Sequence, residues 1–169
     1  MIKPEVWSDE RGYFKETFQS LRYFGAGVEL PLVQDNFSKS TRDVLRGLHF
    51  QRNKPQGKLV SCLRGAVFDV VVDINQESST FGKHFAIELS EDNHLQVWIP
   101  PGYAHGFCVI SSSALVHYKT SDYYDPHDEG GVIWDDPELA ISWPVKSPKL
   151  SPKDRRWPRL GEIFLGNFT

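Results

Sequence analysis

Residues 46–58 hold the densest group of side chains that could do chemistry in this chain. Within this stretch lie a histidine, His49, a cation at each end, and several amide donors. Because Leu48 and Phe50 flank the histidine, we expect it to lie where water is scarce and where its proton affinity can be tuned for acid or base work. The alternative is a core histidine with one satisfied hydrogen bond, which is the more common situation for a lone histidine.

A second histidine, His105, follows a proline-glycine turn in residues 99–107 and begins a strand-like run. This arrangement places an imidazole at the mouth of a β-barrel and matches the second half of the cupin metal signature, P-x-G-x-x-H. The first half needs a second histidine and a carboxylate close behind His49, whereas residues 52–54 are Arg-Asn-Lys. Two histidines without a third ligand make a poor divalent-metal site, so we predict no metal.

Two further candidates lie far along the chain. Tyr118 shares a strand face with Thr120 and could look into the same interior as His49, where a buried hydroxyl can donate a proton if cations stabilise its phenolate. Most strand tyrosines, however, only fill a half-buried surface. Asp154 lies in a charged stretch, residues 150–158, that is typical of a solvated turn anchored by Trp157. The carboxylate gains a role only if this tail folds back onto His49.

The N-terminal region adds polar side chains in two strand-like segments, residues 9–18 and 33–37. Each segment alone is typical of an ordinary edge strand. Together they add four residues to the possible polar lining of a site: Arg11, Glu16, Gln34 and Asn36.

Most of the chain has the composition of β-strands. Runs rich in Val, Ile, Phe, Tyr and Trp are separated by breaks that contain Gly, Pro, Ser or Asn, which indicates an all-β sandwich or barrel. Two strand-rich halves joined near residues 75–82 fit a double-sheet jelly roll of the cupin type. We expect strands at residues 12–17, 33–38, 58–64, 66–73, 84–89, 96–99, 105–110 and 114–120.

Alternation is clearest in residues 67–73. Phe68, Val70 and Val72 share one face of this strand, which should be dry, while Asp69 and Asp73 share the other. The second face could look into a polar cavity or into solvent, and solvent is the default expectation.

Helical pattern is scarce. We expect one short helix near residues 18–24 and a turn near residues 136–140. Four prolines follow Trp143, so the C-terminal tail should wrap the domain as loops and turns. The length of 169 residues predicts a single domain, residues 1–169.

The overall composition excludes several classes of function. With a net charge of −3 and a pI of about 6.1 the chain lacks the basic footprint of a general nucleic-acid binder. No segment reaches the apolar length of a membrane span and the N-terminus shows no leader pattern, so we expect a cytoplasmic protein with no membrane partner. The two cysteines, Cys62 and Cys108, lie in apolar runs and should be reduced core thiols.

Taken in order, these motifs closely resemble the dTDP-4-dehydrorhamnose 3,5-epimerase family, also called dTDP-4-dehydro-6-deoxyglucose 3,5-epimerases. Any one motif would be weak, but together they run from residue 9 to about residue 160. The stretches that carry the resemblance are residues 9–16, 34–36, 45–49, 55–60, 65–70, 98–107, 118–124, 134–137 and 150–154.

The resemblance implies a cofactor-free, cupin-fold homodimer that acts on a nucleotide-linked 4-keto-6-deoxyhexose. By that likeness His49 is the general base, Asp154 orients its ring, Tyr118 is the acid on the opposite sugar face, and Lys58 stabilises the enolate. It assigns contacts with the nucleotide, phosphate or sugar to eight more residues: Arg11, Glu16, Gln34, Asn36, Arg46, His105, Glu129 and Lys153.

The expected reaction is epimerisation at C3 and C5 of dTDP-4-dehydro-6-deoxy-D-glucose, which supplies the L-rhamnose precursor of surface polysaccharide. Close alternatives are an epimerase that acts at C3 or C5 only, or one that acts on another nucleotide-linked 4-keto-6-deoxy sugar. More distant alternatives are a metal-dependent cupin and a jelly roll that binds a sugar nucleotide without turnover.

Overall fold

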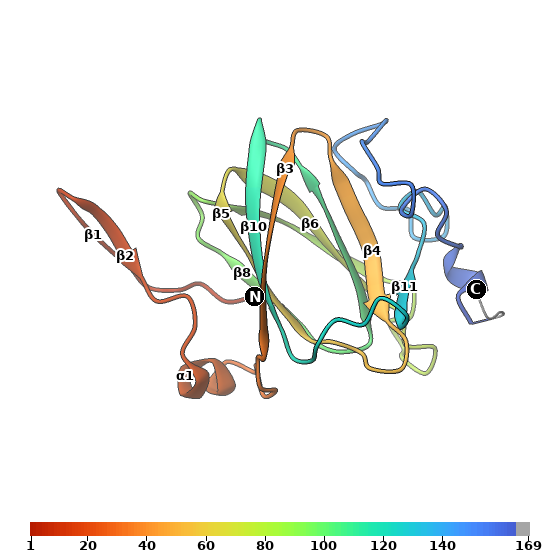
Figure 1. Cartoon of the computed structure of the whole chain (residues 1–169), viewed down its shortest axis with the longest axis horizontal. Helices are drawn as coiled ribbons and strands as arrows, with labels where there is room; N and C mark the ends of the chain where they lie inside the picture. Colours follow the sequence, from red (N-terminus) through yellow and green to blue (C-terminus); the bar gives the residue numbers. More distant parts are fainter. Residues whose placement is uncertain (165–169) are drawn as a thin grey trace.

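The computed structural model describes residues 1–164 as an antiparallel β-structure with little helix (Figure 1). The expectation of an all-β, cupin-type double-sheet jelly roll is confirmed. The elements are β1 (Val6–Asp9), β2 (Gly12–Lys15), α1 (Ser20–Gly25), β3 (Gln34–Thr41), β4 (Leu45–Gln51), β5 (Lys58–Arg64), β6 (Ala66–Asp73), β7 (His84–Ser90), β8 (Gln96–Ile99), β9 (Tyr103–Val109), β10 (Ser113–Thr120), β11 (Glu129–Gly131) and the 3₁₀ turn η1 (Leu160–Glu162).

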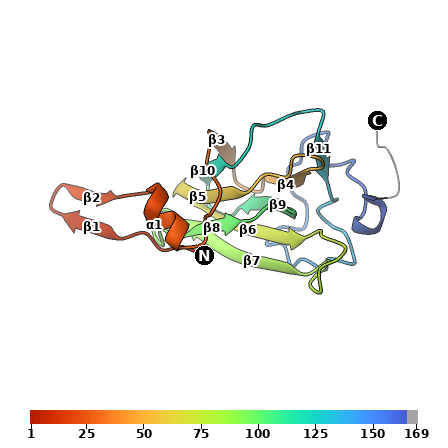
Figure 2. The same cartoon turned by 90° about the horizontal axis from the view of Figure 1, so that it is seen from below.

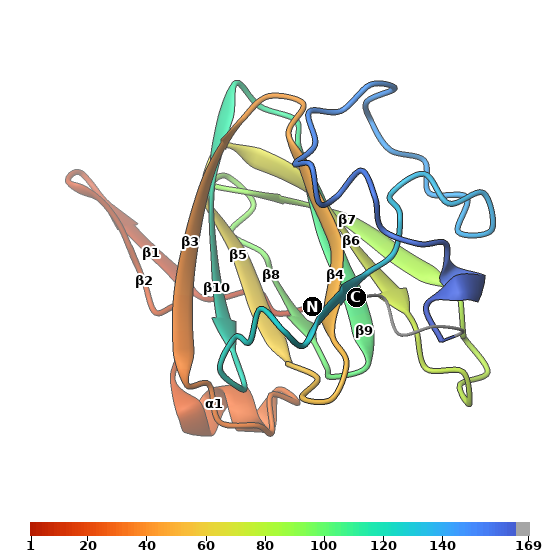
Figure 3. The same ribbon diagram turned by 45° about the vertical axis from the view of Figure 1, so that its right-hand side comes forward.

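Two sheets face each other and form the body of the molecule. One has four strands in the order β3-β10-β5-β8, and the other has five in the order β11-β4-β9-β6-β7. Strands that follow each other in the chain, such as β3 and β4 or β5 and β6, thus fall in different sheets, as Figure 3 shows. This alternation brings residues that are far apart in sequence to opposite walls of one interior.

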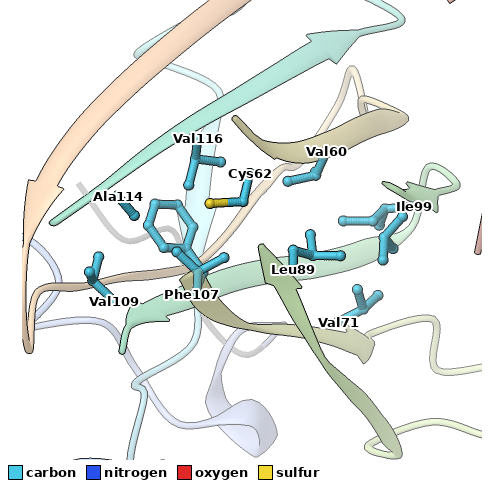
Figure 4. Packing of buried hydrophobic residues seen from close by; sticks show 11 residues of the cluster. Val60, Cys62, Val71, Leu89, Ile99, Phe107, Val109, Ala114 and Val116 are labelled. Atoms are coloured by element: carbon cyan, nitrogen blue, oxygen red, sulfur yellow. The ribbon is translucent and has the colours of Figure 1, made fainter. Parts of the chain in front are cut away.

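The main apolar core lies between the two sheets (Figure 4). Val60 and Val116 come from the four-stranded sheet, and Leu89 and Phe107 come from the five-stranded sheet; all four are buried. These side chains occupy one part of the sandwich and leave the remaining part to polar groups. Burial of this apolar surface is the main force that holds the sheets together.

Strand β6 has two buried faces. Val67 and Val71 pack into the core between the sheets, while Val70 and Val72 belong to a second apolar cluster on the outer side of the five-stranded sheet. Asp69, on the inner face, is 0% exposed. The expectation of solvent on the aspartate face is therefore wrong, because the opposite sheet covers it.

The C-terminal segment forms the cover of that second cluster. Leu139, Leu160 and Ile163 pack there against Leu48 of β4 and other residues of the five-stranded sheet. As expected from its prolines, the described part of this tail consists of loops, turns and η1. Figure 3 shows it running beside β4 and β11, which brings the tail next to the strand that carries His49.

The N-terminal elements are not part of the two main sheets. The hairpin of β1 and β2 projects from the body, and α1 lies at its base near the four-stranded sheet (Figures 1 and 2). Tyr23 of α1 is buried beside Leu59 of β5, and its hydroxyl donates a hydrogen bond to Gln96 at 2.7 Å. Helix α1 is thereby fixed to the sheet, and the hairpin touches the body at His94, whose ring contacts Tyr13 and Lys15.

Most expected strands match observed ones within a few residues, and those at residues 58–64, 66–73 and 96–99 agree at both ends. Strands β1, β4 and β11 have no counterpart among the expected strands. Of these, β4 matters most, because it carries Arg46 and His49. Its Gly47 interrupts the pattern of a regular strand, which explains why periodicity did not detect it.

Candidate active site

A cavity of about 280 Å³ opens between the two sheets. Strands β3, β5 and β10 supply one wall, and β4, β9 and β11 supply the other. Its lining contains a mixture of cationic, acidic, amide, hydroxyl and aromatic groups. The residues are Gln34, Asn36, Ser38, Arg46, His49, Phe50, Gln51, Gln56, Lys58, His105, Phe107, Tyr118, Thr120, Tyr124 and Glu129.

His49 and Asp154 form a hydrogen-bonded pair at this cavity. The distance from Nε2 of the histidine to Oδ1 of the aspartate is 2.5 Å. The imidazole is 27% exposed, and the carboxylate is 4% exposed. Since Nε2 donates to the carboxylate, Nδ1 keeps the lone pair that could accept a proton. The tail does fold back onto His49, so the interpretation of Asp154 as a solvated turn residue is wrong.

The pKa of Asp154 reflects two opposing effects. Burial works to raise this pKa, because it disfavours the charged carboxylate. The hydrogen bond and charge of His49, together with hydrogen bonds involving Ser151 and Trp157, lower it further than burial raises it. The net result is a pKa below the ordinary value for aspartate, so Asp154 is a carboxylate at neutral pH and can hold the imidazole in one tautomer.

A break in strand register places Arg46 and His49 on the same side of β4. Residues three apart in a regular strand point to opposite faces. Here Arg46 pairs with Phe107, but His49 pairs with His105, so β4 advances three residues while β9 advances two. The extra residue is a β-bulge, and both side chains consequently line the cavity.

Gly47 makes this bulge possible. Its φ is +132°, which L side chains rarely adopt, and a Cβ placed on it would lie 2.5 Å from Cα of Gly106. The backbones of β4 and β9 therefore touch where neither residue has a side chain. Any larger residue at Gly47 would separate the strands that carry Arg46, His49 and His105.

Lys58 reaches across the cavity from the opposite sheet. Its Nζ donates to the carbonyl oxygen of His49 at 3.4 Å. Burial lowers the pKa of Lys58 to about 8, although the negative charges of Glu129 and Asp69 partly counteract this effect. The ammonium is thus mostly protonated at neutral pH but easily deprotonated above it.

Tyr118 enters the cavity from β10 in the four-stranded sheet, opposite the sheet that carries His49. Burial raises the pKa of its hydroxyl, the charge of Arg46 lowers it, and the charge of Glu129 raises it again. The net pKa lies above the ordinary value for tyrosine, so the hydroxyl keeps its proton at neutral pH. It is thus available as a proton donor.

A second histidine-carboxylate pair lies next to the first. Nε2 of His105 is 2.8 Å from Oδ2 of Asp69, and both groups are buried. The other oxygen of Asp69 has no hydrogen-bond partner within residues 1–164. His105 is opposite His49 in the β4-β9 pairing, so the two imidazoles lie on adjacent strands. Asp69 was not expected in the site. Its alternation with Val67 and Val71, which places all three on one strand face, could have indicated that it points into the interior.

Glu129 joins the cavity to the C-terminal segment. It accepts a hydrogen bond from the Tyr124 hydroxyl at 2.9 Å, and Lys153 contacts the same oxygen through its ammonium group. Lys153 is therefore beside the cavity rather than in its lining. The site thus contains Glu129 as expected, with Lys153 attached to it and adjacent to Asp154.

Strand β3 contributes a row of polar side chains to the same wall. Gln34 donates to Asn36 Oδ1 at 2.8 Å, and Arg46 donates to Ser40 Oγ at 3.0 Å. Gln34 and Asn36 were expected here. Sequence reasoning missed Ser38, although its spacing of two from Asn36 was a signal. It also missed a further set of lining residues: Phe50, Gln51, Gln56, Phe107, Thr120 and Tyr124.

Arg11 and Glu16 are not part of this cavity. Arg11 is at the end of the projecting hairpin, with a side chain 84% exposed and paired with Asp9. Glu16 pairs with Arg22 of α1 at 3.0 Å. Their expected contacts with substrate stay predictions, because a single chain does not bring them to the other site residues.

Other chemistry is sparse in the described part of the chain. Within residues 1–164, no three His, Cys, Asp or Glu side chains are grouped so that they could hold a metal ion. Cys62 and Cys108 are buried free thiols, as expected, and burial raises the pKa of each to about 11. No helix in this part of the chain has the length and apolar character that a membrane span requires.

Comparison with known proteins identifies the family of the chain. The sequence model of the dTDP-4-dehydrorhamnose 3,5-epimerase family matches residues 1–162. The chain belongs to this family. It is 49% identical over 167 residues to the dTDP-4-dehydrorhamnose 3,5-epimerase of Escherichia coli strain K12, covering 97% of this chain and 90% of the relative.

Two further relatives bear on the reaction. A crystal structure of the 3,5-epimerase of Legionella pneumophila in complex with dTDP-4-keto-L-rhamnose superposes with a TM-score of 0.93 at 50% identity, covering 95% of this chain and 87% of that one. A protein of Streptomyces niveus named dTDP-4-dehydrorhamnose 3-epimerase is 46% identical over 156 residues, covering 91% of this chain and 75% of the relative.

The ionisation of Lys58 gives a direct test of the cavity's electrostatics. We expect its ammonium to titrate near pH 8, and we expect Glu129→Gln to lower this pKa, because the mutation removes a negative charge that favours the protonated form. NMR of ¹³C-labelled lysine would follow the titration, with Lys58→Arg to assign the signal. Glu88→Gln, an exposed change on β7, is the control. An unchanged titration in Glu129→Gln would contradict the proposed balance of charges.

Proposed function

We propose that this protein is an isomerase that converts dTDP-4-dehydro-6-deoxy-D-glucose into dTDP-4-dehydro-L-rhamnose by epimerising C3 and C5, in dTDP-L-rhamnose biosynthesis. One observation carries the proposal. A single cavity contains a carboxylate-bound histidine from one sheet, and a protonated tyrosine and a partly buried lysine from the other. Membership of the epimerase family supplies the substrate class for this set of groups.

The chemistry of the substrate explains why these groups suffice. The protons at C3 and C5 are both next to the C4 ketone, so removal of either gives an enolate that the ketone itself stabilises. The protein has to supply a base, a donor for the enolate oxygen and an acid on the opposite face of the sugar. The substrate provides its own electron sink, so the proposal requires neither a nicotinamide nor a metal.

We assign these roles to three residues. His49 removes the proton through Nδ1, while Asp154 holds the other ring nitrogen and stabilises the imidazolium that forms. Tyr118 returns a proton from the facing sheet, which inverts the carbon. Lys58, partly buried and mostly cationic at neutral pH, would stabilise the enolate oxygen more effectively than an exposed lysine could, because less water screens it.

The remaining polar lining would hold the nucleotide, the diphosphate and the sugar hydroxyls. Arg46 offers a planar set of donors suited to phosphate oxygens, and the amides of Gln34 and Asn36 lie beside it on the neighbouring sheet. His105 is adjacent to His49 and could contact the sugar. The similar Legionella epimerase was crystallised in complex with dTDP-4-keto-L-rhamnose, which supports a dTDP-sugar as the ligand of this cavity.

We also propose that the enzyme is a homodimer. Many of the large apolar side chains exposed in the described part of the chain belong to the N-terminal region, including Trp7, Phe14, Leu21 and Phe37. Strand β3 is at an edge of its sheet, where it can pair with another chain. A second copy against this surface would also account for Arg11 and Glu16, which would then serve the partner's cavity. The cytoplasmic location and the surface-polysaccharide product stay predictions from the sequence.

Loss of the base should remove most of the activity. We expect His49→Ala to lower kcat by at least about 10²-fold, since general-base catalysis typically contributes that much, and Tyr118→Phe to have a comparable effect. Steady-state kinetics with dTDP-4-keto-6-deoxyglucose would measure both. His127→Ala and Tyr123→Phe, which change exposed residues of a nearby loop, are the matched controls. Full activity in both site variants would refute the mechanism and would favour a binding protein without turnover.

Reaction in D₂O distinguishes the double epimerase from its single-carbon relatives. We expect deuterium at both C3 and C5 of the product, because each carbon is deprotonated and then reprotonated from solvent-exchanged groups. NMR or mass spectrometry of the isolated sugar nucleotide gives the positions. Label at one carbon alone would show a mono-epimerase, which is the activity in the name of the Streptomyces niveus relative.

Mixing two defective variants tests the dimer. We expect Arg11→Ala to raise KM and His49→Ala to abolish turnover, and we expect their mixture, after subunit exchange, to regain activity at low substrate concentration. The hybrid dimer would contain one cavity with an intact His49 and an intact Arg11 from the partner. Sedimentation should give twice the chain mass of 19.3 kDa. A monomeric mass, or activity no higher than that of the unmixed variants, would contradict the shared site.

A further inference from the structure

Trp157 contacts the His49–Asp154 pair in a way that its sequence position did not reveal. Its indole Nε1 donates a hydrogen bond to Oδ1 of Asp154 at 3.3 Å. This is the same oxygen that accepts the hydrogen bond from Nε2 of His49 at 2.5 Å. One carboxylate oxygen therefore serves two nitrogen donors, one from β4 and one from the C-terminal segment.

The indole has a fixed place in the structure. It lies against Gly131 of β11, where a Cβ would be only 2.4 Å from the ring, so the contact depends on that glycine. Gly131 is directly opposite His49 in the β11-β4 pairing. The next residue, Pro158, accepts a hydrogen bond from the backbone N–H of Ile133 at 2.8 Å, which ties this part of the tail to the chain that leaves β11.

The same indole also borders the imidazole. The ring centroids of His49 and Trp157 are 6.0 Å apart with an interplanar angle of 68°, and Nζ of Lys153 is 5.9 Å from the indole centroid. Trp157 is itself only partly exposed. It thus occupies the space beside the pair that water would otherwise fill.

We propose that Trp157 is a positioning residue, which acts through Asp154 to favour the neutral, proton-accepting form of His49. A carboxylate that accepts a second hydrogen bond has a lower affinity for protons, so it attracts the proton on His49 Nε2 less strongly. The imidazolium is then less favoured, and more of the histidine is available as a base. This inference rests on the proposed role of His49 as the general base.

Other charged or titratable groups near the imidazole also contribute to its electrostatic environment. Lys58 contacts the backbone carbonyl of His49, His105 lies on the adjacent strand, and Glu129 lies on β11 with Lys153 paired to it. Within residues 1–164, Asp154 is hydrogen-bonded to a ring nitrogen of His49, and none of these other groups is. A change at Trp157 should therefore reach His49 through the shared oxygen of Asp154.

Trp157→Phe tests this inference because it keeps an aromatic ring and removes the N–H donor, together with part of the ring volume that the Trp143→Phe control removes equally. We expect the acid limb of the kcat/KM profile to move to higher pH, with activity reduced about threefold to tenfold at pH 6 and less than about twofold at pH 8. Trp143→Phe is the matched control. It removes another indole hydrogen bond, 2.8 Å to the Trp134 carbonyl, from a part of the tail outside the cavity.

A spectroscopic readout makes the test independent of turnover. The proton shared by His49 and Asp154 should give a low-field NMR signal that His49→Ala removes, that Trp157→Phe shifts, and that Trp143→Phe leaves in place. Gly131→Ala provides a second variant, in which the indole keeps its N–H but is displaced from Asp154. We expect the same direction of change in its pH profile and in the position of the signal.

The outcomes separate this inference from the proposed function. A loss of rate in Trp157→Phe that is equal at every pH, or an unshifted low-field signal, would reduce Trp157 to a packing residue and overturn the inference. If His49→Ala abolishes activity at the same time, the proposed function stands. If His49→Ala is fully active, the proposed function fails instead, and the low-field signal still decides whether Trp157 modifies the pair.

Discussion

The bulge in β4 is the constraint on which the arrangement of the site depends. Without the extra residue at Gly47, Arg46 and His49 would point to opposite faces of the five-stranded sheet, and only one of them could reach the cavity. The close approach of Gly47 and Gly106 also brings His105 next to His49. Two glycines with no chemistry of their own therefore decide which functional groups meet.

The properties of the site also depend on how the interior accommodates charged groups. A buried ion is costly unless it is paired and hydrogen-bonded, and this cavity contains Lys58, Glu129 and, behind its wall, Asp69. Burial lowers the pKa of Lys58 to about 8, and the charges of Glu129 and Asp69 keep it from falling further, so the lysine stays mostly protonated at neutral pH. The interior thus holds a lysine whose pKa lies close to neutral pH. The C-terminal segment completes the site from outside the two sheets, because the apolar contacts that hold it against the five-stranded sheet also bring Asp154 and Trp157 to the edge of β4.

Sequence patterns alone predicted the fold class, most of the strands and the identity of the central groups. Alternating runs separated by turn residues predicted the sandwich, since a strand that buries one face must repeat with a period of two. The order of the motifs indicated the epimerase family and named His49, Lys58, Tyr118 and Asp154, all of which the structure brings to one cavity or its wall. Local pattern could not have assembled them.

The contacts that join distant segments arise only when the chain has folded. The bulge at Gly47 is defined by the pairing of β4 with β9. The sequence of β4 alone does not show which of its residues lacks a partner on β9. The burial of Asp69 depends on a sheet that lies over it, and the role of Trp157 depends on a glycine in β11. Composition and spacing fix which face of a segment is polar, but pKa values and hydrogen bonds depend on distance and burial, which exist only once the chain has folded.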